Sequence, residues 1–188
     1  GIAYVADLRE ESAVGKLFDD VEAQIGPIGV AVFNTGANYR ASILDTPADM
    51  FEKVWRLGCY AGFLVGREAA RHMAPRGHGT IIFTGATASV RGSAQFAAFA
   101  AAKGALRQVA QSMARELGAQ GIHVASVIVD GMIDSQRVRE RFPERVAQLP
   151  EDGMLKPADI AEVYWQIAQQ PRSAWTFETD LRPWAEKF

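Results

Sequence analysis

The chain alternates short apolar runs with longer segments of helical periodicity, and this alternation restricts its fold more than any other feature. The apolar runs have strand length and are rich in β-branched residues, and helical segments of ten residues or more separate them. Strands that are apolar throughout are typical of a parallel sheet covered by helices on both faces. We therefore predict an α/β fold with a doubly wound, mostly parallel sheet. The expected strands are residues 2–6, 28–33, 80–84, 122–129 and 175–181.

Apolar side chains at helical spacing predict the helices between these strands. Val14, Leu17, Phe18 and Val21 recur on one helix face, and Gly26-Pro27 ends that helix. An alanine-rich segment favours a helix that packs closely on its neighbours. The further expected helices are residues 46–73, 96–117, 135–149 and 157–169.

Composition narrows the class of protein. A length of 188 residues, with 48% hydrophobic and 22% charged residues, suits one soluble domain with a sizeable core. The net charge of -2 gives no sign of a nucleic-acid or membrane partner. Cys59 is the single cysteine, so no disulfide can form within the chain, and no apolar run approaches the ~20 residues of a membrane span. The single cysteine fits a reducing compartment, and we expect a cytoplasmic protein.

Small and polar residues follow the expected strands. They are Asp7, Asn34-Thr35-Gly36, Gly85 and Asp130-Gly131. The carboxyl ends of parallel strands meet at one edge of a sheet, where ligands of such folds bind. Glycine, asparagine and aspartate also suit any strand-to-helix turn. The residues alone therefore leave two interpretations open, a cofactor site or ordinary turns.

Six segments, taken in order, resemble the short-chain dehydrogenase/reductase family and together cover almost the whole chain. They are VADLREE, VFNTGAN, GTIIFTGATASVRG, FAAFAAAKGAL, ARELGAQGIHVASVIVDG and KPADIAEVYWQIA. The resemblance implies a Rossmann-like domain over residues 1–188. It also implies hydride transfer between NAD or NADP and an alcohol or carbonyl substrate.

The first departure from the family pattern concerns the phosphate-binding turn. The family has a Thr-Gly-x-x-x-Gly-x-Gly turn after its first strand, which holds the pyrophosphate, and the 188 residues contain none. By resemblance the chain starts at the family's third strand, so that the first two strands and their helices are lacking. In the family's strand order 3-2-1-4-5-6-7, residues 2–6 then either pair directly with residues 28–33 or belong to a fragment of a longer protein. Gly1, in place of a methionine, favours the fragment. We expect this chain alone to bind no dinucleotide tightly.

The second departure concerns catalysis. The family's tyrosine, lysine, serine and asparagine positions fall on Phe99, Lys103, Ala86 and Gly58, so only the lysine remains. The tyrosine normally exchanges a proton with the substrate oxygen, which contributes ~10² to 10⁴ in rate. The resemblance implies that Lys103 contacts the cofactor ribose, although a helical lysine can also be a solvated surface charge.

The resemblance also assigns the remaining site residues. Hydroxyls of Thr87, Ser89 or Tyr60, or water, are candidates to replace the tyrosine, although serine and threonine need an activating base. No pair of histidines has metal-ligand spacing, so we expect no metal. The expected cofactor contacts are Asp7, Leu8, Asn34, Thr35, Gly36, Thr84, Gly85, Lys103 and Gly131. The expected substrate contacts are Thr87, Ser89, Phe96 and Met132.

Two further expectations follow from the family. Residues 132–154, with Phe142, Leu149 and Met154, are either a mobile substrate lid or a solvated connection. The helices at residues 51–73 and 96–117 correspond to the family's subunit contacts, which implies a homodimer or homotetramer.

The sequence leaves two functions open. One is an oxidoreductase with altered proton transfer. The other is a catalytically inactive relative that senses a cofactor or binds a partner. The loss of three catalytic side chains motivates the second, and the preserved layout with Lys103 motivates the first. Fold alone does not decide between them.

Overall fold

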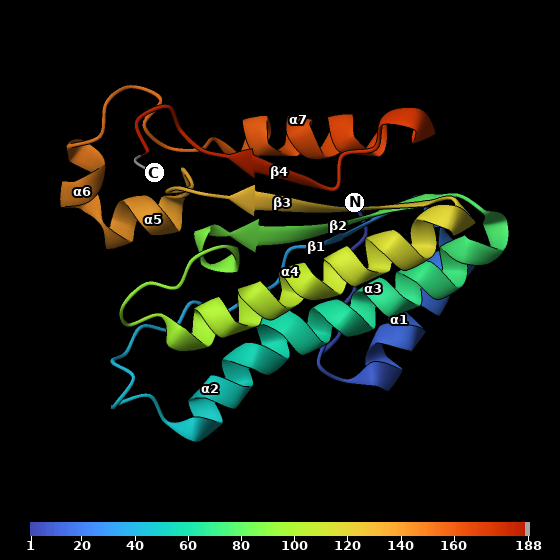
Figure 1. Ribbon diagram of the computed structural model, residues 1–188, viewed down its shortest axis with the longest axis horizontal. Coiled ribbons are helices and arrows are strands. Elements are labelled where there is room, and N and C mark those ends of the chain that lie inside the picture. Colours follow the sequence, from blue (N-terminus) through green and yellow to red (C-terminus); the bar gives the residue numbers. More distant parts are fainter. Residues whose placement is uncertain (187–188) are drawn as a thin grey trace.

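The computed structural model describes residues 1–186 and has a four-stranded, fully parallel sheet at its centre (Figure 1). The strands are β1 (Val30–Phe33), β2 (Gly79–Ala86), β3 (Ile122–Val129) and β4 (Glu178–Leu181), and they lie side by side in chain order. All three strand pairs are parallel. The predicted doubly wound α/β fold is confirmed.

Helices cover both faces of this sheet (Figure 1). On one face lie α1 (Glu11–Gln24), α3 (Ala61–Met73) and α4 (Ala97–Leu117), and α7 (Pro157–Ala168) lies on the other. The short helices α5 (Gln136–Arg141) and α6 (Pro143–Ala147) lie beyond the carboxyl ends of the strands. Within residues 1–186, no helix combines the length and apolarity that a membrane crossing requires.

The core has two apolar layers, one on each face of the sheet. Phe33, Leu64, Phe83 and Leu106 belong to the larger layer, beneath the three helices. The smaller layer lies under α7 and is formed by Ile82, Ala125, Val127, Val129 and Ile167. Every residue of β3 is buried, which explains why its sequence lacks the polar–apolar alternation of a half-exposed strand.

The helix expected at residues 46–73 is one continuous helical run with a wider turn in its middle. It comprises α2 (Ala48–Trp55), a π-helical turn at Arg56–Tyr60 and then α3. The turn brings Gly58 against α4, where a Cβ on Gly58 would lie 2.9 Å from the Cβ of Ala102. Gly58 therefore permits the close approach of two helices.

The prediction of a strand at residues 2–6 is wrong. These residues form no strand, do not pair with β1, and leave Val5 fully exposed. An extended segment needs a neighbouring strand to satisfy its backbone groups, and residues 2–6 pair with none of the four strands. The outer edge of β1 is accordingly open, with Val30 and Val32 more than 40% exposed.

The helix expected at residues 135–149 is also interrupted. Ser135 caps α5 by accepting a hydrogen bond from the Val138 backbone N–H. The helix ends at Arg141 because Pro143 disfavours helical geometry at Phe142, whose φ and ψ are -132° and 51°. Pro143 then begins α6, a position at which its missing N–H costs nothing.

Candidate active site

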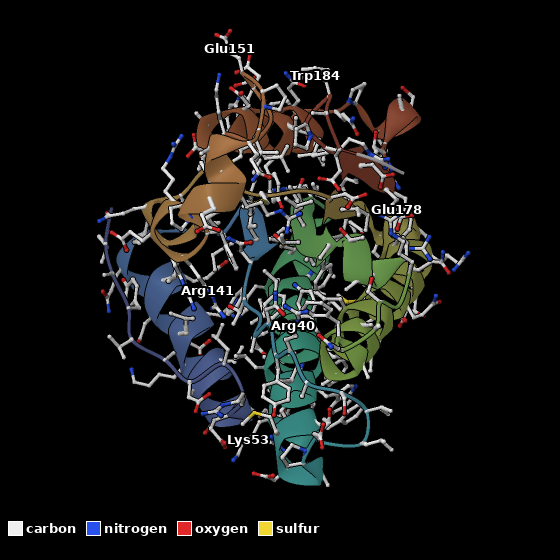
Figure 2. All side chains as sticks on the ribbon, turned by 90° about the vertical axis from the view of Figure 1, so that its left-hand side faces the viewer. Arg40, Lys53, Arg141, Glu151, Glu178 and Trp184 are labelled. Carbon is white, nitrogen blue, oxygen red and sulfur yellow. The ribbon has the colours of Figure 1, made fainter. Side chains whose placement is uncertain are left out.

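A cavity of about 580 Å³ opens at the carboxyl end of the sheet. Figure 2 looks onto this end of the molecule, where Arg40, from the loop after β1, and Arg141, from α5, are labelled. The ends of β1, β2 and β3 and the start of α4 supply the lining. It includes Asn34, Thr35, Gly36, Thr84, Gly85, Ala86, Thr87, Phe96, Phe99, Lys103, Gly131 and Met132.

Lys103 reaches this cavity from α4 and is only 6% exposed. Its Nζ donates a hydrogen bond to the Thr84 carbonyl at 2.8 Å and lies 3.5 Å from the Thr35 carbonyl. Loss of solvation lowers the pKa of the Lys103 ammonium to about 8. The side chain is therefore not the solvated surface charge that the sequence left as an alternative.

Positions of the family's hydroxyl residues face the cavity but carry no hydroxyl. Phe99 lies one helical turn before Lys103 and lines the same cavity, and Ala86 is the last residue of β2 and also lines it. Gly58 lies outside the lining and packs on Ala102 instead. The cavity thus brings Lys103 together with Phe99 and Ala86, the positions to which the resemblance assigned the tyrosine and the serine.

The cavity fits the nicotinamide–ribose half of a dinucleotide. A Cβ on Gly36 would lie 3.3 Å from the Lys103 Cε, so glycine leaves room for Lys103. A Cβ on Gly85 would lie 2.7 Å from the Ile128 Cδ1, so glycine there allows β2 to pack against that side chain. Asn34 and Thr35 add polar groups beside them. The pyrophosphate half has no glycine-rich turn to bind within the 188 residues.

Thr87 and Asp130 form a pair at the cavity wall that the sequence did not reveal. The Thr87 Oγ1 donates a short hydrogen bond to the Asp130 Oδ1, and Asp130 is only 5% exposed. The Asp130 Oδ2 lies 3.8 Å from the Arg91 Nη2 and 3.9 Å from the Arg182 Nη2. The sequence left Asp130 open as part of a cofactor site or of an ordinary turn, and did not pair it with Thr87. The available signal was a carboxylate directly after a strand whose residues are apolar or small except for His123.

The other two hydroxyl candidates lie elsewhere. Ser89 is 7% exposed, and its Oγ accepts a hydrogen bond from the Ala86 backbone N–H at 3.0 Å. Tyr60 packs against the core and stacks on Trp55 with ring centroids 6.3 Å apart. Neither lines the cavity, so of the three predicted hydroxyl candidates, all within the described residues, Thr87 alone does so.

Asp7 and Leu8, expected at the cofactor site, lie outside this cavity. The Asp7 carboxylate accepts hydrogen bonds from Arg9 at 2.9 and 2.6 Å, and this contact lowers the pKa of Asp7 to about 2. Leu8 lines a separate apolar groove between α1 and β1. The structure therefore does not bring these two residues together with Lys103.

Apolar side chains form one side of the cavity. Phe96 lines it, and the Arg40 guanidinium lies 5.9 Å from the centroid of the Phe96 ring while its Nε donates to Gln95 at 2.6 Å. Met132 and Val138, from the segment expected to be a lid, also line it. Phe142, in the same segment, is 44% exposed.

Comparisons with known proteins agree with this architecture. The family described as enoyl-(acyl carrier protein) reductase matches residues 1–179. The 3-oxoacyl-(acyl carrier protein) reductase MabA of Mycobacterium tuberculosis is 31% identical over 171 residues, which are 89% of this chain and 69% of that protein. A short-chain dehydrogenase crystal structure from Rhodopseudomonas palustris is 46% identical with a TM-score of 0.81, covering 97% of this chain and 74% of the other. The structure of ElxO with NADP bound shares the fold alone, with a TM-score of 0.83 at 17% identity over 94% of this chain and 75% of that one.

Proposed function

The chain belongs to the short-chain dehydrogenase/reductase family, and from this premise we propose that it is an NAD- or NADP-linked oxidoreductase with altered proton transfer, acting on an alcohol or carbonyl. The observation that carries the proposal is the buried Lys103 in a cavity at the carboxyl end of the sheet. A lysine without an acidic partner is costly to bury. Its retention beside Phe99, where the tyrosine is lost, favours a binding role.

Residues on different sides of the cavity have different roles in the proposed reaction. When bound, a nicotinamide cofactor supplies the hydride acceptor or donor. Lys103, Asn34 and Thr35 would hold its ribose, and Gly85 and Gly131 would lie along the nicotinamide side. Phe96, Phe99 and Met132 provide apolar contacts that exclude water from the reacting carbon. The segment at residues 132–154 is proposed to close over the substrate.

Absorbance of the reduced nicotinamide tests the proposal. The full-length protein is assayed with NAD and NADP against a panel of alcohols and carbonyls. We expect turnover in the unmodified protein and its loss in Lys103→Met, which removes the ammonium group but keeps the length of the side chain. Trp165→Phe, on the exposed face of α7, serves as the control. Absence of turnover across the whole panel would contradict the proposal.

A second candidate function is a catalytically inactive relative that senses a cofactor or binds a partner. The missing hydroxyls at Phe99 and Ala86, both of which line the cavity, favour it. In that case the double substitution Phe99→Tyr and Ala86→Ser is expected to create turnover in a protein that has none. Turnover in the unmodified protein that disappears in Lys103→Met would exclude this second candidate.

We also propose a homodimer or homotetramer built on the outer face of α2 and α3. Phe51, Trp55 and Phe63 on this face are each 37% exposed. Aromatic side chains are enriched in protein interfaces. The family resemblance of these helices supplies the identity of the partner, which is a second copy of the chain.

A further inference from the structure

We propose that Thr87 and Asp130 form the proton-accepting pair of this site, with Thr87 as the catalytic residue that contacts the substrate oxygen. Asp130 is the positioning residue behind Thr87 and the final acceptor of the proton. The inference rests on the proposed oxidoreductase function and adds the groups that take the place of the missing tyrosine.

The sheet register places the two residues side by side. Ala86 pairs with Val129 at the carboxyl ends of β2 and β3, so Thr87 and Asp130 are the next residue on each of two adjacent parallel strands. Thr87 lines the cavity together with Phe99 and Lys103. Its hydroxyl donates to the Asp130 Oδ1, which leaves the lone pairs of the Thr87 Oγ1 available to a substrate hydroxyl.

Asp130 is buried at the cavity wall, between the Thr87 hydroxyl and two guanidinium groups. It is 5% exposed, and a buried carboxylate is stable only with hydrogen bonds or opposite charges beside it. The guanidinium groups of Arg91 and Arg182 lie 3.8 and 3.9 Å from its Oδ2. They occupy the side of the carboxylate away from Thr87, so Oδ1 points to the hydroxyl that it is proposed to deprotonate.

The proton step balances for oxidation of an alcohol. The substrate O–H bond breaks and its proton moves to the Thr87 Oγ1, while the Thr87 hydroxyl proton moves to the Asp130 Oδ1. The electron pair of the O–H bond would become the second carbon–oxygen bond of the product, and a bound oxidised nicotinamide would supply the acceptor for the hydride that the carbon loses. Reduction of a carbonyl follows the same path in reverse. Threonine alone is too weak an acid and base for this step, and the carboxylate supplies the missing activation.

Four substitutions test the proposal in the full-length protein. Asp130→Asn keeps an acceptor for the Thr87 hydroxyl but cannot take a proton, and Thr87→Val removes the hydroxyl at almost constant shape. We expect each to lower kcat for alcohol oxidation by about 10²- to 10⁴-fold with little change in KM. Thr87→Ser is expected to retain most of the turnover. Thr80→Val, the same replacement at the opposite end of β2, is the control.

Nuclear magnetic resonance of the 188-residue chain provides a readout without cofactor. We expect a slowly exchanging hydroxyl proton on Thr87, with faster exchange in Asp130→Ala. If Thr87→Val and Asp130→Asn both turn over as fast as the unmodified protein, the proposed role of the pair is overturned while the proposed function stands. A protein with no turnover at all would overturn the proposed function, and the catalytic role of the pair with it, even if the slow hydroxyl proton is observed. A Thr87 hydroxyl that exchanges freely in the unmodified chain would overturn the pair on its own.

Discussion

At the scale of single residues, Lys103 places a buried positive charge at the site. Its ammonium is 6% exposed and has carbonyl oxygens rather than carboxylates as its hydrogen-bond partners. Carbonyl dipoles compensate a buried charge less completely than an opposite charge does. The pKa of Lys103 is therefore lowered from 10.5 to about 8 in the folded chain.

The lowered pKa of Lys103 predicts how the free energy of unfolding changes with pH. Between about pH 8 and pH 10.5, the unfolded chain holds a proton on Lys103 that the folded chain has released. The free energy of unfolding then rises with pH. Relative to Lys103→Met, the unmodified chain should gain up to ~3 kcal/mol across this window, at 1.36 kcal/mol per pKa unit.

Urea unfolding of both proteins at several pH values measures this difference. Below pH 8 both states of the unmodified chain are protonated, so the difference from Lys103→Met should be constant there. Parallel stability curves from pH 7 to pH 10 would show that the Lys103 ammonium is well solvated in the folded chain.

The sequence can predict which residues meet when their spacing within one helix or strand brings them together. The helical spacing of Phe99 and Lys103 placed both on one face of α4, and the structure has both in the cavity lining. Asp130 and Thr87 lie 43 positions apart, and their contact depends on strand register. No periodicity within one element reports register between two strands, so their pairing could not be derived from the sequence.

At the scale of elements, the helices and the four central strands follow from apolar patterning. Residues 2–6 have the same apolar composition as the true strands, and yet they form none. A strand needs a neighbouring strand to satisfy its backbone hydrogen-bonding groups, whereas a helix satisfies most of them within itself. The residue composition likewise does not predict the π-helical turn at Arg56–Tyr60, because this turn arises where α4 packs against Gly58.

Gly58 offers a test of this packing. Gly58→Ala is expected to lower the free energy of unfolding by about 1–3 kcal/mol, because the added Cβ would meet the Ala102 Cβ at 2.9 Å. Gly15→Ala in α1 is the matched control, since no atom lies within 4 Å of its added Cβ. It should raise stability by about 0.5–1 kcal/mol. Thermal or urea unfolding distinguishes the two, and equal effects of both substitutions would contradict the close approach of the helices.

At the scale of the whole molecule, the proposed oligomer predicts the effect of charge on one face. Trp55→Glu and Phe63→Glu are each expected to convert the assembly to monomers, because a carboxylate buried at an apolar interface lacks a partner. Trp165→Glu, on α7 at the other face and 60% exposed, should leave the assembly unchanged. Size-exclusion chromatography with light scattering gives the masses. A monomeric unmodified protein would remove the proposal.

We propose that the cavity around Lys103 receives the nicotinamide–ribose half of the cofactor. A nuclear magnetic resonance titration of the 188-residue chain with NAD and NADP detects such binding residue by residue. We predict weak, millimolar binding, because the chain has no glycine-rich turn. The shift changes should gather at Gly36, Gly85 and Lys103. Saturating cofactor that leaves these resonances unchanged, or that instead shifts residues of the groove between α1 and β1, would contradict the account.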